Sequence, residues 1–319
     1  MWKEGIRNIH TAVAGLLGTA TLMTLAAPLG WPFEIASHFP LHFAVVALFV
    51  AVWCAYRKAG EATILALMVL AVQGSLVVPF FLEQNAISEP GDFRVLTANV
   101  LYKSDDYGAM LELVAAEDPD IVIIVEETPS WKEGLSALSV SYPHQEHSGA
   151  TTRVRGMSGV GVYSKTPISV RSLENVPYRD ERPALAVTTT LAGKEVTLVA
   201  VHPWTPHTPG AYAKRNAQLT ALAEFTASVG EYAIMVGDMN ITPQSPDFEP
   251  LVASHGLESA RVGRGWAPSW PAPLGWLGIP IDHAFVTGGI EVSDFRMGPF
   301  VGSDHYPTIL DFSVEADGR

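Results

Sequence analysis

Short runs rich in β-branched residues recur after residue 91, and they constrain the fold more than any other feature of the chain. Turn-forming residues bound each run, as they bound the strands of a sheet. Between the runs, residues 106–118 and 211–230 have the period of helices instead. The runs are "RVLTANV", "DIVIIVEE", "GVGVYSK", "ALAVTTTL", "EVTLVAVHP", "YAIMVGDMN", "IDHAFVTG" and "TILDFSV". Several strands and few helices predict two packed sheets with helices on the outside.

Polar residues stand at the ends of these otherwise apolar runs. Asp238 and Asn240 in "VGDMN" are two residues apart, so an extended strand would place both side chains on one face. Asp and Asn are also ordinary turn formers, but a buried carboxylate needs a partner or a metal ion. A single cleft at one edge of the sandwich would account for all of these ends. The residues concerned are Asn99, Glu126, His202, Asp238, Asn240, Asp282, Asp304 and His305.

The N-terminal part of the chain has a different pattern. Residues 8–33, 35–56 and 62–82 contain no Asp, Glu, Lys or Arg, and each stretch exceeds the ~20 residues that cross a hydrocarbon core. They predict three transmembrane helices. The first stretch also has the basic start of a signal peptide, but its length and the two stretches that follow favour a retained anchor. The expected parts are an anchor, a linker, a strand-rich domain and a tail, at residues 1–83, 84–91, 92–315 and 316–319.

Basic residues in short loops predict the orientation of such an anchor. Lys3 and Arg7 precede the first stretch, and Arg57 and Lys58 lie between the second and the third. The loop between the first two stretches has neither Lys nor Arg. The strand-rich domain is therefore expected on the outer side of the cytoplasmic membrane, with the lipid bilayer as a partner.

The formal net charge is −13, and all of this excess lies after residue 88, because four acidic and four basic residues cancel before it. Proteins that grip long nucleic acids present a basic stripe, so this balance disfavours tight, sequence-independent DNA binding. Cys54 is the single cysteine, which excludes an internal disulfide and a cysteine-rich metal site.

Six short motifs, spread along the strand-rich part of the chain, together resemble one enzyme superfamily. From the N-terminal to the C-terminal side they are "LTANV", "PDIVIIVEET", "VAVHP", "VGDMN", "PIDHAF" and "GSDHYPT". They are similar to motifs of the endonuclease/exonuclease/phosphatase superfamily, over roughly residues 92–314. With three apolar stretches ahead of them, they look like a membrane-anchored bacterial branch. The resemblance implies an α+β fold, a DNase I-like four-layer α/β sandwich preceded by three transmembrane helices, at a bacterial inner membrane. It also makes residues 92–315 a catalytic domain that uses Mg²⁺, with Mn²⁺ as the alternative.

The resemblance also implies a metal site. Glu126, six residues after Asp120 as in the family's pattern, is expected to bind the metal ion. Asn99 would complete the ligand set or hold Glu126 in place, and Asp304 would bind the metal directly or through water. Val125 stands where the family often has Gln, which weakens the interpretation as a nuclease.

The remaining residues are expected to act on a phosphoester. Asp238 would orient or deprotonate the attacking water, and Asn240 would donate to a phosphoryl oxygen. His305 is the second candidate base, with Asp282 fixing its tautomer. His202 would bind the phosphate or protonate the leaving oxygen. The sequence leaves open whether Asp238 or His305 is the base.

Two further features bear on the substrate. Residues 264–280 contain three tryptophans among prolines and glycines, and they form either a self-packed loop or an apolar platform beside the cleft. One or two of the arginines at positions 153, 155, 179 and 182 are candidates to meet an anionic headgroup, although exposed arginines are commoner.

The expected activity is hydrolysis of a phosphomonoester, phosphodiester or pyrophosphate that is lipid-linked or extracytoplasmic. The alternatives are an extracytoplasmic nuclease acting on DNA or nucleotides, and a non-catalytic binding domain on the same fold.

Overall fold

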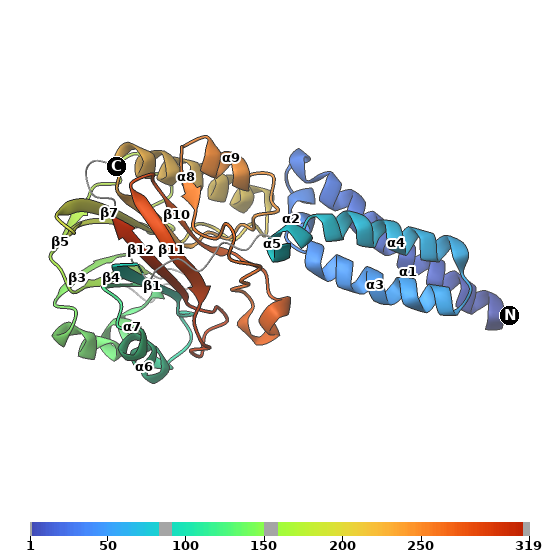
Figure 1. Cartoon of the computed structure of the whole chain (residues 1–319), viewed down its shortest axis with the longest axis horizontal. Helices are drawn as coiled ribbons and strands as arrows, with labels where there is room; N and C mark the ends of the chain where they lie inside the picture. Colours follow the sequence, from blue (N-terminus) through green and yellow to red (C-terminus); the bar gives the residue numbers. More distant parts are fainter. Residues whose placement is uncertain (1, 83–90, 150–158, 315–319) are drawn as a thin grey trace. The chain divides into compact units, whose positions relative to one another are not determined.

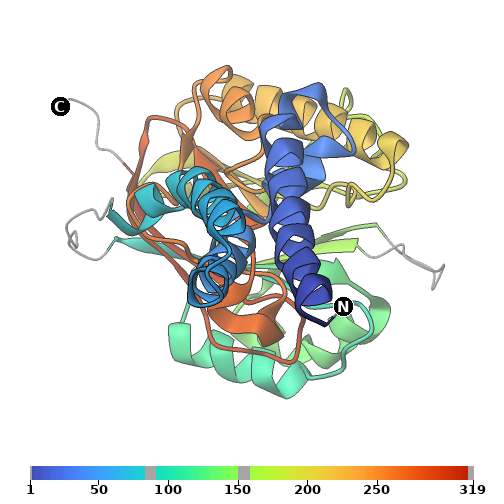
Figure 2. The same cartoon turned by 90° about the vertical axis from the view of Figure 1, so that its right-hand side faces the viewer.

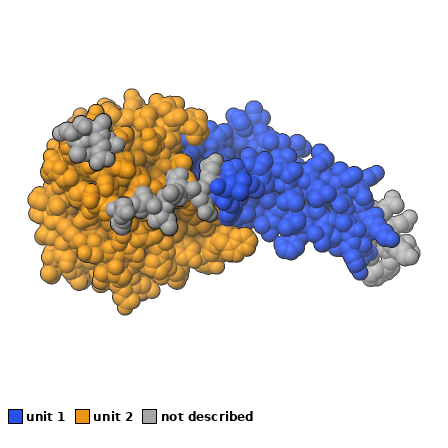
Figure 3. All heavy atoms as spheres, in the orientation of Figure 1, with its two compact units in different colours: residues 1–83, 242–248 blue, residues 84–241, 249–319 orange. Residues whose placement is uncertain are grey.

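The computed structural model describes residues 2–82, 91–149 and 159–314, with side chains from residue 9 onward. The chain forms two units, which Figure 3 colours separately. Unit 1 comprises Met1–Glu83 and Thr242–Phe248, and unit 2 comprises Gln84–Ile241 and Glu249–Arg319.

Unit 1 is helical. Its elements are α1 (Trp2–Leu25), η1 (Ala27–Leu29), α2 (Phe33–Ser37), α3 (Pro40–Tyr56), α4 (Gly60–Ser75) and α5 (Val78–Leu82). α1, α3 and α4 lie side by side (Figures 1 and 2). Small buried side chains such as Ala14, Ala47 and Ala66 let these helices approach closely, and Gln73 donates hydrogen bonds to Thr21 and Thr24.

The predicted three-span anchor is wrong. Within the described ranges, no helix combines the length and the apolar character that a membrane crossing requires. α3 has 17 residues and α4 has 16, so each spans about 25 Å, less than a hydrocarbon core of about 30 Å. α1 is longer, but it carries charged residues in its first turns and several threonines after them. The predicted multi-pass location in the bacterial inner membrane depended on this anchor and is therefore also wrong. The likeness to a membrane-anchored branch of the superfamily depended on the same stretches.

Unit 2 contains two six-stranded sheets. The first has the order β11-β12-β1-β2-β4-β3, and the second has the order β5-β6-β7-β8-β10-β9. The strands of the first sheet are β1 (Phe93–Asn99), β2 (Ile121–Glu127), β3 (His144–Ser148), β4 (Gly159–Ser164), β11 (Ile290–Met297) and β12 (Thr308–Val314). Those of the second are β5 (Ile168–Arg171), β6 (Leu185–Leu191), β7 (Lys194–Val201), β8 (Ala233–Asp238), β9 (Glu258–Ser259) and β10 (Asp282–Val286).

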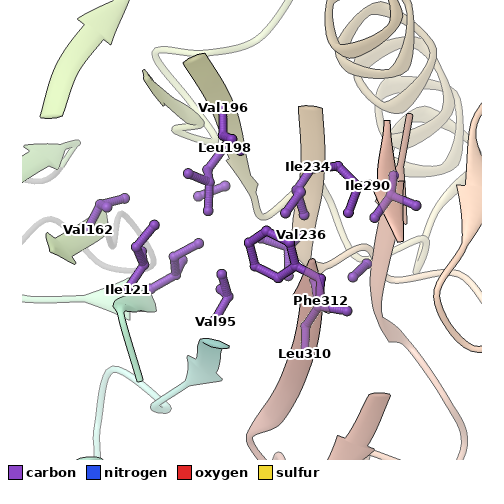
Figure 4. Packing of buried hydrophobic residues seen from close by; sticks show 14 of the residues in the cluster. Val95, Ile121, Val162, Val196, Leu198, Ile234, Val236, Ile290, Leu310 and Phe312 are labelled. Atoms are coloured by element: carbon purple, nitrogen blue, oxygen red, sulfur yellow. The ribbon is translucent and has the colours of Figure 1, made fainter. Parts of the chain in front are cut away.

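The main core lies between the two sheets. Alternate residues of the strands fill it, for example Ile121 from β2 and Ile234 and Val236 from β8 (Figure 4). Ile123 and Val125 of β2 belong to the same core. The other face of β2, with Val122 and Ile124, packs against helices instead. A strand buried on both faces is apolar throughout, which explains the continuous run "IVIIV".

The remaining helices are α6 (Tyr107–Glu117), α7 (Pro129–Gly134), α8 (Pro209–Ser228) and α9 (Phe248–Ala253), with the short turns η2 (Ser136–Val140) and η3 (Ala272–Leu277). Three of these helices cover the outer faces of the sheets. α6 and α7 pack on the first sheet, and α8 packs on β7 and β8 of the second (Figure 1). The order helices, sheet, sheet, helices confirms the sandwich part of the predicted fold. Strands such as β3, "HQEHS", were not predicted because polar residues hide their period.

Candidate active site

The site residues predicted from strand ends meet at one edge of the two sheets, and strand direction explains why. β1 runs parallel to β2, and β7 runs parallel to β8, so the carboxyl ends of each pair share an edge. β10 is antiparallel to β8 and β12 to β1, so both begin where those strands end. Asp238, the last residue of β8, therefore lies directly across the sheet from Asp282, the first residue of β10.

A glycine sets the spacing between the ends of β7 and β8. Gly237 has φ of +145°, and a β-carbon there would collide with the carbonyl oxygen of Val201, its partner in the register. The residues that follow this close approach are His202 and Asp238. The Nε2 atom of His202 lies 3.5 Å from Oδ2 of Asp238.

Asp238 lies at the centre of the cluster. Its Oδ2 accepts a hydrogen bond of 3.0 Å from Nδ2 of Asn99 and lies 3.6 Å from Nε2 of His305. Its Oδ1 accepts a hydrogen bond of 3.0 Å from the backbone N–H of Asn240. Burial raises the pKa of Asp238, while the positive charge of His305 works in the opposite direction. The carboxylate is thus fixed by donors and desolvated at the same time.

Asp282 and His305 form a buried pair. Nδ1 of His305 lies 2.8 Å from Oδ2 of Asp282. Burial alone would lower the pKa of His305, but the charges of Asp282 and Asp238 outweigh it and raise that pKa. Burial alone would raise the pKa of Asp282. The charge and the hydrogen bond of His305 outweigh burial, so the pKa of Asp282 is lowered. The pair is therefore an imidazolium bonded to a carboxylate, with Nε2 directed at Asp238.

His202 and Glu126 lie on the other side of Asp238. Oε1 of Glu126 is 3.6 Å from Nε2 of His202. Burial first, and then the charges of Arg182 and His305, lower the pKa of His202 to about 3, so this imidazole is neutral at pH 7. Glu126 has φ of +64° at a bulge in β2, which turns its side chain out of the alternation. Its Oε2 accepts a hydrogen bond from the backbone N–H of Tyr102.

Asn240 is held by its surroundings. It has φ of +51°, a conformation that Asn adopts more readily than most residues. Its side-chain Nδ2 donates a hydrogen bond of 3.2 Å to the carbonyl of Pro203, and its own carbonyl accepts one from the buried Arg215. One N–H of the side-chain amide is therefore used within the protein.

Asp304 is placed differently from the other predicted ligands. Its Oδ2 accepts a hydrogen bond of 3.1 Å from Nε1 of Trp270, and its carbonyl accepts one from the N–H of Ala272. Both donors belong to the aromatic loop 264–280. Asp304 therefore ties this loop to the site, although Trp276 farther along the loop is 64% exposed.

Several residues that position the cluster carried no clear sequence signal. Ser303 Oγ donates to the carbonyl of Asn99 and accepts from the N–H of His305, and Ser269 Oγ accepts from the N–H of Asp282. The i, i+2 spacing of Ser303 and His305 is a turn pattern that could have indicated the bond between Ser303 Oγ and the N–H of His305. The buried Arg261 donates to the carbonyl of Asp282.

Glu127 lies outside the cluster. Its Oε1 accepts a hydrogen bond of 2.5 Å from the hydroxyl of Tyr163, and its Oε2 lies 2.7 Å from Nδ1 of His147. It is 5% exposed and both of its carboxylate oxygens contact other side chains, so its role is structural.

The chemistry of the donor set suits a hard divalent cation. Mg²⁺ prefers oxygen ligands and keeps several waters, and here Glu126, Asp238 and Asp282 bring three carboxylates to one edge. Ligand atoms of Asp238, Asp282 and His305 lie within 4.8 Å of one another. Both nitrogens of His305 already face carboxylates, however, and nitrogen is not a ligand that Mg²⁺ favours. The oxygen atoms of Glu126 and Asn99 fit the cation better.

The model of the Endonuclease/Exonuclease/phosphatase family matches residues 96–305, a range that contains every residue of the cluster. The chain belongs to that family. Its members hydrolyse phosphoric ester bonds, generally with a divalent metal ion, so the chain is a phosphoester hydrolase. No curated protein sequence matches it.

Solved structures of several proteins have a similar fold. An endonuclease/exonuclease/phosphatase from Beutenbergia cavernae is 20% identical, with a TM-score of 0.55 over 71% of this chain and 72% of that one. TDP2 of D. rerio, complexed with single strand DNA product, is 16% identical, with a TM-score of 0.54 over 69% of this chain and 98% of that one. Sphingomyelinase C from Streptomyces griseocarneus is 18% identical, with a TM-score of 0.50 over 70% and 99%. At these identities the likeness concerns the fold alone.

Proposed function

We propose that this chain is a Mg²⁺-dependent phosphoesterase that hydrolyses a phosphomonoester, a phosphodiester or a pyrophosphate. The observation that carries the proposal is the chain of side-chain contacts from Asp282 through His305 to Asp238. Asn99 and His202 also contact Asp238. Such a chain of contacts holds one proton acceptor and one cationic donor next to each other in a buried site, as hydrolysis of a phosphoester requires.

The electrostatics favour Asp238 as the group that orients and deprotonates the water. His305 lies between two carboxylates that raise its pKa, so it carries its proton at neutral pH and is a donor rather than a base. Asp238 receives N–H donors from Asn99 and Asn240, which fix its carboxylate plane. His305 would then stabilise the negative charge that develops on the phosphoryl oxygens.

His202 and Asn240 are proposed to bind the phosphoryl group. A pKa of about 3 keeps His202 neutral, so it donates a hydrogen bond and does not act as a general acid at pH 7. Glu126 and Asn99 would hold Mg²⁺, with Asp304 contributing through water. When bound, Mg²⁺ supplies charge neutralisation at the phosphoryl oxygens.

The lipid-linked phosphate expected from the apolar stretches loses its main support with the anchor. What remains is the aromatic loop, which contacts Asp304 through Trp270 and exposes Trp276 and Leu274. A nuclease is the second candidate, since one solved structure of similar fold holds a DNA product, whereas the net charge of −13 opposes a long polyanion.

A substrate panel tests the proposal. Phosphate monoesters, diesters, lipid pyrophosphates and supercoiled plasmid are incubated with the protein and Mg²⁺, and with Asp238→Ala and His305→Ala. We expect phosphate release or nicking from at least one class, lost in both variants. Inertness of the wild-type protein toward every class, with the fold intact by circular dichroism, would favour a non-catalytic binding domain instead.

A further inference from the structure

Two cations lie against one tryptophan beside the candidate active site. The guanidinium carbon of Arg182 is 4.9 Å from the ring centre of Trp204, and Nζ of Lys214 is 4.6 Å from the same centre. Lys214 also lies 5.0 Å from the ring centre of Tyr178. Cations within about 6 Å of an aromatic ring are attracted to it, so Trp204 and Tyr178 hold these positive charges in place.

This group, Tyr178, Arg182, Trp204 and Lys214, adjoins the catalytic cluster. Trp204 follows His202 by two residues, and the intervening Pro203 accepts the side-chain hydrogen bond of Asn240. The positive charge of Arg182 reaches His202, where it contributes to lowering the pKa of the imidazole. A ligand bound at His202 and Asn240 would therefore lie next to these cations.

The local chemistry favours an anion. Lys214 pairs with Glu181 at 2.6 Å, but both side chains are partly open to solvent, and ion pairs of this kind contribute little to stability. A doubly charged ligand can replace such a partner. The indole Nε1 of Trp204 is buried and has no acceptor among the described residues, so an oxygen atom of a ligand would satisfy it. This positive group stands out in a domain that carries the whole net charge of −13.

We propose that Arg182, Trp204 and Lys214 form a second phosphate subsite, which selects substrates that carry a further phosphate beyond the one that is hydrolysed. The inference rests on the proposed phosphoesterase function and narrows it to a substrate class. The second phosphate belongs either to a small bisphosphate compound or to the next nucleotide of a strand. In both cases the subsite acts on binding and not on the bond-breaking step.

Calorimetric titration tests the subsite without relying on turnover. Thymidine 5′-monophosphate and thymidine 3′,5′-bisphosphate are titrated into the full-length protein in the presence of Mg²⁺. We expect the bisphosphate to bind about tenfold more tightly, equivalent to one charge-assisted contact. Arg182→Gln should reduce this preference to about twofold or less, and Trp204→Ala should do the same. Arg179→Gln, an exposed arginine of the same loop, is the matched control and should retain it.

Equal affinity of the wild-type protein for the two nucleotides would overturn the inference, as would an undiminished preference in Arg182→Gln. Circular dichroism and the melting temperature establish that each variant is folded. Titration with short oligothymidylates separates the two sources: affinity that stops rising at the second phosphate indicates a small bisphosphate, and affinity that rises further indicates a strand. Absence of hydrolysis in the substrate panel would refute the phosphoesterase proposal while leaving this binding preference measurable.

Discussion

The imidazole Nδ1 of His305 lies 2.8 Å from the carboxylate Oδ2 of Asp282, and this contact joins the start of β10 to the segment that leads into β12. The two strands belong to different sheets. A pair made in this way forms only when the two sheets pack together, so the candidate site and the fold depend on the same packing.

The Asp282–His305 pair predicts a change in the pH dependence of activity. Asp282→Asn removes a negative charge that raises the pKa of His305, so that pKa should fall. Since the protonated form is the proposed donor, activity is lost as pH rises through this pKa, and the alkaline limb should move to lower pH. At neutral pH kcat/KM should fall about 100-fold or more.

The pH–rate profile of the variant, measured on the best substrate of the panel, checks this prediction. Asp180→Asn, at an exposed position, should leave the profile unchanged. An alkaline limb that stays in place in Asp282→Asn would show that His305 does not act as the donor.

Activity should depend on a divalent metal ion and on the charge of Glu126. EDTA should abolish activity, and Mg²⁺ or Mn²⁺ should restore it. Glu126→Gln keeps the shape of the side chain but removes its charge, so half-maximal activity should require about tenfold more Mg²⁺, because ligand charge tunes the affinity of a carboxylate site. Activity as a function of Mg²⁺ concentration measures this, with Glu133→Gln on the exposed side of α7 as control. An unchanged requirement would remove Glu126 from the ligand set.

The buried His283 should make the free energy of unfolding depend on pH. Burial, followed by the charge of Arg261, lowers its pKa to about 3, while Nε2 bonds the carbonyl of Ile241. The unfolded chain binds this proton below about pH 6.5 and the folded chain does not, so stability falls as pH drops from 6.5 toward 3. In the His283→Gln variant the side chain does not titrate, so this contribution to the pH dependence is absent. Relative to this variant, the wild type should lose up to about 2 kcal/mol between pH 7 and pH 5.

Urea denaturation at the two pH values provides the comparison for His283. Equal losses in the wild type and in His283→Gln would mean that the folded imidazole takes up its proton in the ordinary range.

The turn between β6 and β7 predicts a stabilising substitution. Ala192 and Gly193 both have positive φ, 49° and 78°, between the paired residues Leu191 and Lys194. This geometry favours Asn-Gly in a two-residue hairpin, so Ala192→Asn should add about 0.5–1 kcal/mol to the free energy of unfolding. Gly193→Ala, which meets no neighbouring atom, should cost a similar amount through backbone strain alone. Thermal melting measures both, and a loss of stability in Ala192→Asn would contradict the assignment of the turn.

Much of unit 2 could be predicted from the chain itself. Runs such as "IVIIV" at β2 are apolar because both faces of the strand are covered, and this local pattern gives the strand and its depth. The alternation of apolar and polar residues did not predict strands that are polar throughout, such as β3. The charge-free stretches of unit 1 led to a second wrong prediction, that of membrane spans. For α3 and α4 the lengths of the helices decided against a membrane span, since for example the uncharged stretch 62–82 divides between α4 and α5, whereas α1 is long but carries charged residues in its first turns.

The sequence by itself determined which residues stand at strand ends, because the change from apolar to polar residues is written in the chain. It named Asn99, Glu126, His202, Asp238, Asn240, Asp282 and His305, and the fold brings these side chains to one edge. Only the tertiary structure decided which of them touch: that Asn99 donates to Asp238, that Asp304 bonds Trp270 in the aromatic loop, and that two cations surround Trp204. Such contacts join residues up to about two hundred positions apart, and their distances and the resulting pKa shifts arise only when both sheets pack.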